Sequence, residues 1–265
     1  MTDKEVTYLR ELPVRKSNLL IQQSRYTLSA RQFDLITHLA SLIKPENKPG
    51  TIYNITISEL CRVCGWDKKN GGNYRDIKEQ LDTIDRLTKW IKQEDGREVR
   101  FRWFDRLEME EGSGTITVSF HSTIEPYLYG VERRFTQYIA ECIYAMKSKY
   151  SKFLYDWLKS YERQGHIGIT LEDFSKYVCP NDYPEYKGIN QWIITPALKE
   201  INEMTDITVK CEAKKTHGSR KTNYLLFTII PVNSGIEESV RAVNRDISLD
   251  GYKEETAAEE DELPF

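Results

Sequence analysis

The amino-acid sequence predicts an α+β protein built from two copies of one structural unit, followed by a disordered acidic tail. Three observations support this prediction. One order of helices and strands occurs twice, 39% of the 265 residues are hydrophobic, and acidic side chains concentrate in the last thirty residues. A chain of this length and hydrophobic content is expected to form one or two domains with packed cores.

The first copy begins with a helix over residues 28–43, where apolar residues recur at helical spacing. The following elements are a β-rich run at 52–57, a brief helix capped by Ser58 and a third helix over 74–90. Alternating residues then predict strands at 99–104 and 115–120, joined by a turn at 111–114.

The second copy repeats this order from residue 148 onward. Its predicted elements are a helix over 148–163, a strand leading into a short helix at 169–174, a helix over 189–204, and strands at 207–213 and 223–230 around a basic turn. Helix, strand, helix, helix and a two-stranded wing is the order of a winged helix-turn-helix domain.

We place the joint between the copies near residue 130. Residues 135–146 are predicted to form a linking helix with Thr136 as its cap. The predicted domains are therefore residues 1–130 and 131–235, with the acidic tail at 236–265.

The net charge of −3 is unevenly distributed along the chain. Residues 236–265 carry ten acidic and three basic side chains, a net charge of −7, whereas residues 1–235 carry a net charge of +4. A mildly basic body of this kind is compatible with nucleic-acid binding.

The sequence argues against an enzyme, a bound metal or a cofactor. It contains no Gly-x-x-x-x-Gly-Lys phosphate loop, its four histidines are far apart, and Cys61-x-x-Cys64 lacks the second pair of a structural zinc site. Sixteen tyrosines still offer possible nucleophiles for DNA nicking. Five scattered cysteines and no run of 18 apolar residues predict a reduced, cytoplasmic protein without membrane contact.

The helix over 189–204 is the predicted base-reading element. One face carries isoleucines, and the opposite face carries Gln191, Trp192, Thr195, Lys199 and Asn202 without an acidic residue before Glu200. Asn190, at the start of the helix, is a further predicted DNA contact. Amide, hydroxyl and cationic groups suit base edges and phosphates in a major groove. Pro196 is expected to bend this helix, since it removes one backbone donor. A plain solvated face is the alternative.

Two further segments are predicted to contact DNA. In the wing, residues 210–221 carry a net charge of +4, and we expect Lys214, Lys215, Arg220 and Lys221 to contact phosphates. In the first copy, Arg75 and Lys78 lie among acidic residues, and Lys68 and Lys69 belong to a basic loop. We therefore expect the first copy to contact phosphates or protein.

Several motifs resemble those of the iteron-binding plasmid replication initiators (the Rep_3 type) over residues 14–230. They are Val14–Asn18, Phe135–Thr136, Lys147–Ser151, Leu154–Tyr155 and Pro196–Asp206. The resemblance implies two tandem winged-helix domains in a bacterial protein. The second would read a direct repeat of double-stranded DNA, and the first would contact the DNA backbone and mediate homodimerisation.

The resemblance also implies that monomers initiate replication and that dimers repress their own promoter or pair origins. Host replication proteins, a helicase or its loader, would be partners. The sequence departs from the family at Asn190, Gln191 and Trp192, where members often carry several Arg or Lys.

The first domain also has a candidate dimer contact. Its predicted strand has an apolar face formed by Val99, Phe101 and Trp103, and the edge of this strand could pair with another chain. The alternative is that the strand covers its own core.

The end of the sequence resembles the acidic tip of bacterial single-stranded-DNA-binding proteins. Acidic residues precede Leu263, Pro264 and Phe265, which would dock a partner that reads such tips. A merely solvating tail is the alternative.

The sequence therefore predicts a non-catalytic replication initiator that binds repeats at a plasmid origin, recruits host machinery and represses its own promoter. A winged-helix transcriptional repressor is the main alternative. A nicking rolling-circle initiator is a third, weakened by the missing histidine pair.

Overall fold

The computed structural model describes residues 1–23, 28–66, 72–87, 89–93, 95–110, 112–178, 185–215 and 222–232. The chain starts with α1 (Asp3–Arg10), β1 (Pro13–Ser17) and α2 (Asn18–Gln23). It continues with α3 (Ala30–Ser41), β2 (Tyr53–Thr56), α4 (Ile57–Val63), α5 (Gly72–Arg86), β3 (Lys89–Lys92), β4 (Glu98–Phe101), β5 (Phe104–Met109) and β6 (Thr115–Phe120).

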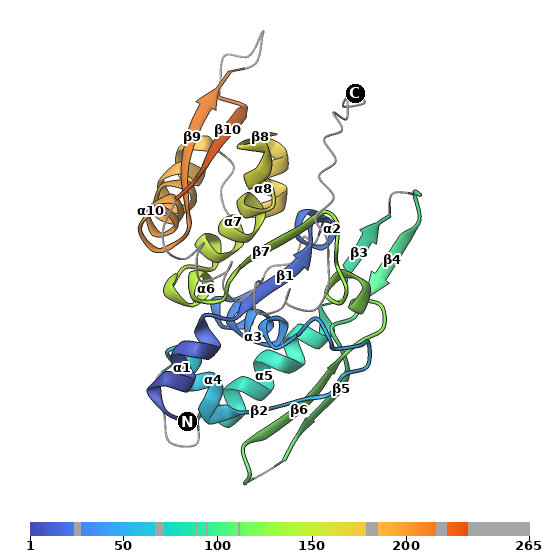
Figure 1. Ribbon diagram of the computed structural model, residues 1–265. Helices are drawn as coiled ribbons and strands as arrows, with labels where there is room; N and C mark the ends of the chain where they lie inside the picture. The colour runs from blue at the N-terminus through green and yellow to red at the C-terminus, as the bar shows by residue number, and fades with distance from the viewer. Residues whose placement is uncertain are drawn as a thin grey trace, which may run out of the picture.

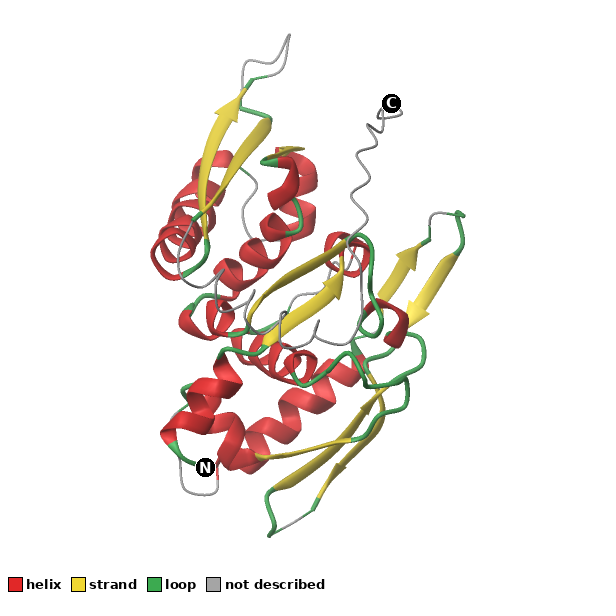
Figure 2. Ribbon diagram, viewed as in Figure 1, coloured by secondary structure: helices red, strands yellow, loops and turns green. Residues whose placement is uncertain are grey.

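The second half contains β7 (Phe135–Ile139), α6 (Glu141–Ala145), α7 (Lys149–Lys159), β8 (His166–Thr170), α8 (Leu171–Val178), α9 (Tyr186–Ile189), a π-helical turn (Asn190–Ile194), α10 (Thr195–Met204), β9 (Ile207–Lys214) and β10 (Tyr224–Pro231). Figure 2 shows helices gathered in the body of the molecule and hairpins reaching outward from it. None of the helices within the described ranges is long and apolar enough to cross a membrane.

Within the described residues, each half includes the helices and the antiparallel sheet of the duplicated pattern. In the first half, α3, α4 and α5 accompany the sheet β2-β6-β5; in the second, α7, α8 and α9–α10 accompany the sheet β8-β10-β9 (Figure 1). Ser29 and Ser148 cap α3 and α7 by accepting hydrogen bonds from backbone amides within the first turn of each helix.

The predicted linking helix over residues 135–146 is wrong in its first part. Residues Phe135–Ile139 form β7, which pairs antiparallel with β1 in the register Pro13–Ile139 to Ser17–Phe135. Thr136 is not a helix cap: its hydroxyl is buried and donates to Asn18 Oδ1 at 2.7 Å. These residues form a strand because β1 supplies a hydrogen-bonded partner for them. The partner is distant in the sequence: Arg15 and Gln137, which lie opposite each other, are 122 residues apart.

The first wing also differs from the prediction. Of the predicted strand at 99–104, only Phe104 pairs with the strand at 115–120, opposite Phe120 as the first residue of β5. Residues 99–101 belong to β4, which pairs with β3. Helix α5 ends at Arg86, before the predicted end, and leaves residues Lys89–Lys92 for the added strand. The cap of α4 is Thr56, whose hydroxyl accepts from the Glu59 amide at 3.1 Å, instead of Ser58.

Two of the three apolar side chains of the predicted dimer edge lie in the interior, and the third, Val99, is half-buried. Phe101 and Trp103 are fully buried, and their rings meet edge to face with centroids 5.8 Å apart. These two side chains therefore cover the core of their own half, as the alternative interpretation held.

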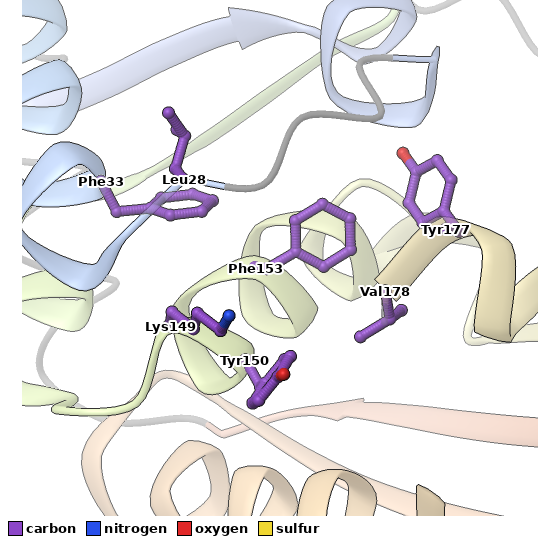
Figure 3. A pocket seen from close by; sticks show the side chains of 7 residues that line it. All are labelled: Leu28, Phe33, Lys149, Tyr150, Phe153, Tyr177 and Val178. Atoms are coloured by element: carbon purple, nitrogen blue, oxygen red, sulfur yellow. The ribbon is translucent and has the colours of Figure 1, made fainter. Parts of the chain in front are cut away.

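The two halves meet through aromatic contacts. Phe153 of α7 lies between Phe33 of α3 and Tyr177 of α8, with ring centroids 6.4 and 5.1 Å away. Figure 3 shows these rings around a small hollow, which Leu28, Lys149, Tyr150 and Val178 also line. The Tyr177 hydroxyl donates to the Ile21 carbonyl at 2.6 Å, which ties α8 to the first half.

Buried ion pairs also join the halves. Lys152 of α7 contacts Asp34 of α3 and donates to the Ile143 carbonyl at 2.9 Å. Asp156, one turn further along α7, accepts from Lys16 of β1 at 2.6 Å. All four charged side chains are buried. Burial raises the pKa of Asp34 to about 6, although Lys152 opposes the rise.

Candidate nucleic-acid interface

The predicted base-reading helix contains a π-helical turn. The Thr195 amide donates to the Asn190 carbonyl, five residues earlier. Pro196 explains this geometry, because its ring has no amide hydrogen and would clash with the carbonyl of Trp192 in a regular α-helix. At Pro196 the helix therefore contains a local widening, which is typical of functional sites.

The π-helical turn presents the predicted reading residues to solvent. Gln191, Trp192, Thr195 and Lys199 are exposed, and Asn190 is half-buried. Trp192 is 59% exposed although it is a large apolar ring. The opposite side of the helix is anchored in the core, and its buried residues are Ile189, Ile193, Ile194, Ala197 and Ile201.

Two polar residues of α10 that the sequence places near this face form hydrogen bonds within the protein instead. Asn202 accepts from the Val209 amide at 2.7 Å and donates to the Val209 carbonyl at 3.1 Å, so it fastens α10 to the wing. Glu200 accepts from the amides of Lys147 and Ser148, 3.3 and 3.2 Å away, at the start of α7. The carboxylate complements the positive end of that helix.

A buried network holds the end of α10 against α7. Asp206 accepts from Lys159 Nζ and from the Tyr155 hydroxyl, both at 2.8 Å. Burial opposes the charge on Lys159, but Asp206 and Glu162 raise its pKa above the ordinary value. Burial also raises the pKa of Tyr155, which keeps its hydroxyl protonated as a donor.

The wing extends from the body beside α10 (Figure 1). Strands β9 and β10 pair from Ile207–Pro231 to Lys214–Tyr224. Lys214 and Lys215 are exposed, and Lys214 lies 3.4 Å from Glu212 in a surface ion pair. The structure thus places these two predicted wing cations at the outer end of β9, a strand whose other end is fastened to α10. The other two, Arg220 and Lys221, lie outside the described residues.

The equivalent helix of the first half, α5, presents a mixed surface. Arg75 and Lys78 are exposed, as predicted, but Glu79 is exposed beside them. Asp76 is engaged by Arg31 of α3. The basic loop residues Lys68 and Lys69 lie outside the described residues.

The cysteines of the Cys61-x-x-Cys64 motif belong to the core. Both are buried, and burial raises the pKa of the Cys64 thiol well above its usual range. Asn73 donates to the Cys61 sulfur at 3.1 Å, which joins α4 to α5. Within the described ranges, no three His, Cys, Asp or Glu residues form a group able to hold a metal ion.

Sequence reasoning did not single out Trp90, an exposed aromatic residue. Trp90 of β3 is 60% exposed, nearly the same fraction as Trp192. The signal was the pair of β-favouring residues Trp90 and Ile91 directly after α5, which the longer predicted helix concealed.

Comparison with known proteins agrees with this architecture. Residues 13–159 match the family described as "Initiator Replication protein, WH1", and residues 170–229 match "Initiator Rep protein, WH2". The chain belongs to this family of replication initiators. The predicted α+β class with two tandem winged-helix domains is confirmed, and so is the resemblance to the initiator family.

Individual relatives of this initiator are distant. A replication initiation protein from Escherichia coli is 25% identical over 259 residues, which cover 92% of this chain and 78% of the relative. The crystal structure of the Pi initiator protein in complex with iteron DNA is similar with a TM-score of 0.68 and 18% identity, and the similarity covers 85% of this chain and 99% of that one.

Proposed function

We propose that this initiator binds repeated double-stranded DNA sequences at a replication origin, and that the π-helical turn and α10 read the bases. The observation that carries the proposal is an exposed, acid-free face of Gln191, Trp192, Thr195 and Lys199 on a helix whose other side is anchored in the core. The similarity to the Pi initiator, whose structure was solved with iteron DNA, supports the same assignment.

The chemistry divides between the helix and the wing. The Gln191 amide offers a donor and an acceptor, the pair that adenine recognition needs, and half-buried Asn190 offers the same pair. Trp192 and the Thr195 methyl supply apolar contact for thymine methyl groups. Lys199 and the wing cations Lys214, Lys215, Arg220 and Lys221 bind phosphates and set the salt dependence.

The domains have different roles in this proposal. Residues 131–235 read sequence, while residues 1–130 contact the DNA backbone through Arg75, Lys78, Lys68 and Lys69 and mediate a repressive homodimer. The protein needs no catalytic step, since base and phosphate contacts suffice to occupy the origin.

Footprinting of the purified protein on the DNA flanking its gene tests the origin assignment. Protection of direct repeats spaced by about two helical turns is expected. A winged-helix repressor without a replication role would use the same protein surface. A plasmid that carries the repeats but no other initiator gene separates the two: replication that depends on this protein supports an initiator, and promoter repression alone supports the repressor.

Recruitment of host replication proteins belongs to the same proposal. The tail residues of this proposal, Leu263, Pro264 and Phe265, lie outside the described residues. Their chemistry fits a partner's pocket that binds an aromatic ring preceded in its own chain by acidic residues. Deletion of Phe265 is expected to abolish plasmid replication while repeat binding stays intact, because one uncharged side chain is removed. Normal replication by this variant would leave the tail a solvated or autoinhibitory segment.

A further inference from the structure

The π-helical turn changes which backbone carbonyls of the reading helix have a hydrogen-bond donor. A carbonyl accepts from the amide four residues later in an α-helix and from the amide five residues later in a π-helix. For Gln191 these two donors would be the amides of Thr195 and Pro196. The Thr195 amide donates to Asn190 instead, and Pro196 has no amide hydrogen. Neither helical donor therefore reaches the Gln191 carbonyl.

This carbonyl lies on the exposed side of the helix. The backbone stays helical through the widening, with φ and ψ of −65° and −47° at Asn190 and of −59° and −49° at Thr195. A helical carbonyl points along the axis toward the residue four positions later, so that of Gln191 points toward Thr195. Gln191, Thr195 and Pro196 are all exposed, whereas the isoleucines of the turn are buried. The carbonyl without a helical donor thus faces solvent on the side that carries the reading residues.

The proline that frees this carbonyl stands where a helix tolerates it least. Pro196 falls inside a continuous helical run from Tyr186 to Met204. Proline is the least favourable residue for a helix interior, because it removes one backbone hydrogen bond. A destabilising residue on the exposed side of the reading helix has a physical explanation if the acceptor that it frees is used.

A free backbone acceptor has a defined use in the major groove. Adenine N6 and cytosine N4 each present an amino donor there, whereas guanine and thymine present acceptor oxygens. A carbonyl therefore accepts a hydrogen bond from adenine or cytosine and discriminates against guanine and thymine. The helix fixes its position, so this contact costs no side-chain rotamer freedom, unlike a contact made by the Gln191 side chain.

We propose that the main-chain carbonyl of Gln191 is a base-reading group, which accepts a hydrogen bond from the exocyclic amino group of an adenine or a cytosine in the repeat. The inference rests on the proposed function, because it requires the helix to lie in a major groove. Pro196 is a positioning residue in this arrangement: together with the π-helical turn, it keeps the carbonyl available to the base.

Base analogues that lack a single amino group test the proposal. In the duplex protected by footprinting, each adenine is replaced in turn by purine and each cytosine by 2-pyrimidinone, and binding of the full-length protein is measured by fluorescence anisotropy. At one base pair the analogue is expected to weaken binding about 2- to 13-fold, as loss of one hydrogen bond does. The double variant Asn190→Ala/Gln191→Ala should keep this loss, because it removes two side-chain amides and retains the carbonyl.

Pro196→Ala should abolish the dependence on that amino group. With an amide at position 196 the Gln191 carbonyl has a donor in either geometry: Thr195 in an α-helix, and the new amide in a π-helix. The melting temperature should rise, because a backbone hydrogen bond is gained, so the weaker binding does not come from unfolding. Lys199→Ala is the matched control on the same face: it should weaken binding to all of these duplexes by one factor and keep the dependence.

Three results would contradict this reasoning at different points. Loss of every amino-group dependence in the double variant overturns the proposal and assigns base reading to the two side chains alone. Retention of the dependence by Pro196→Ala also overturns it, since the carbonyl is then paired within the helix. An unmodified protein that binds the repeat no better than random duplex contradicts the proposed function instead.

Discussion

The ion pair between Asp34 and Lys152 is expected to govern how firmly the two halves of the protein hold together. Both side chains are buried, with 5% and 2% of their surfaces exposed, and they join α3 of the first half to α7 of the second. The perturbation is Lys152→Met, which keeps the aliphatic length and removes the charge. It leaves the Asp34 carboxyl in the same buried position with Trp66 Nε1, 3.3 Å away, as a remaining donor.

The magnitude follows from that burial. Removing one partner of a buried ion pair costs about 3–5 kcal/mol, because the other charge is left uncompensated. Asp34→Asn should cost less, because the neutral side chain avoids the burial of a carboxylate and Lys152 keeps the Ile143 carbonyl as an acceptor. The double variant with both changes leaves no buried charge, so we expect its free energy of unfolding to lie closer to that of the unmodified protein than to that of either single variant.

The pH dependence gives a second, independent readout. The pKa of Asp34 is about 6 in the folded protein against an ordinary 3.8, so the folded state binds the proton more tightly than the unfolded state. Asp34 therefore stabilises the fold fully below pH 4, and this contribution, about 3 kcal/mol, is lost as the pH rises through 6. Without Lys152 the pKa rises further, so the loss extends to higher pH.

Urea unfolding at pH 5, 6 and 7, followed by tryptophan fluorescence, measures both effects. At pH 7 the free energy of unfolding of Lys152→Met should be lower than that of the unmodified protein. Most of this difference should disappear at pH 5, where Asp34 is protonated. An equal deficit at all three pH values would refute the electrostatic reasoning and indicate a packing defect. A double variant that is less stable than both single variants would refute the coupling.

Three further predictions concern the reading helix, the wing and its sheet. Gln191→Ala should cost about 1–3 kcal/mol on the protected repeat and little on random duplex; equal losses in competition assays would exclude base reading. Lys214→Ala should lower the salt slope of duplex binding by about 0.9, with similar losses on all sequences, whereas an unchanged slope removes this residue from the interface. Gly168→Ala should lower the melting temperature, because a Cβ atom would come within 1.8 Å of the Tyr224 hydroxyl; the Tyr224→Ala background should relieve that loss, and an unaltered melting temperature would contradict the clash.

The sequence predicts the second winged unit better than the first, because its elements follow from neighbouring residues. Helix α7, strands β9 and β10 and the helix before them all lie within a few residues of their predicted ranges. In the first unit, α5 was extended over β3, because the apolar spacing through Leu87 continues the helical pattern. Only the pairing of β3 with β4 shows where the helix has to end.

Elements that depend on distant partners were missed. Strand β7 has the alternating pattern of a strand, but its partner β1 lies at the start of the chain, and no local signal identifies that pairing. Asn202 was assigned to the reading face for the same reason: its position on a helical wheel is correct, and its two hydrogen bonds to Val209 are a tertiary feature.

The exposed side of this helix was predicted correctly although the helix is irregular. A helical wheel assumes 3.6 residues per turn, whereas the π-helical turn adds a residue between Ile189 and Ile194. Both Ile193 and Ile194 are apolar, so either register buries an isoleucine and leaves Gln191 and Trp192 exposed. The pattern therefore identifies the exposed side and conceals the widening.

The helix and the wing expose different kinds of side chain. The exposed face from Gln191 to Lys199 has a single formal charge, on Lys199, whereas Lys210, Lys214 and Lys215 place exposed cations on the wing strand and beyond it. Phosphate contacts set the ionic-strength dependence, and polar or apolar contacts with base edges set the discrimination. An initiator arranged in this way is expected to change repeat preference through the helix without a change in salt slope. Changes in the wing are expected to alter its overall affinity for DNA without altering which repeat it prefers. The Gln191→Ala and Lys214→Ala variants together test this separation.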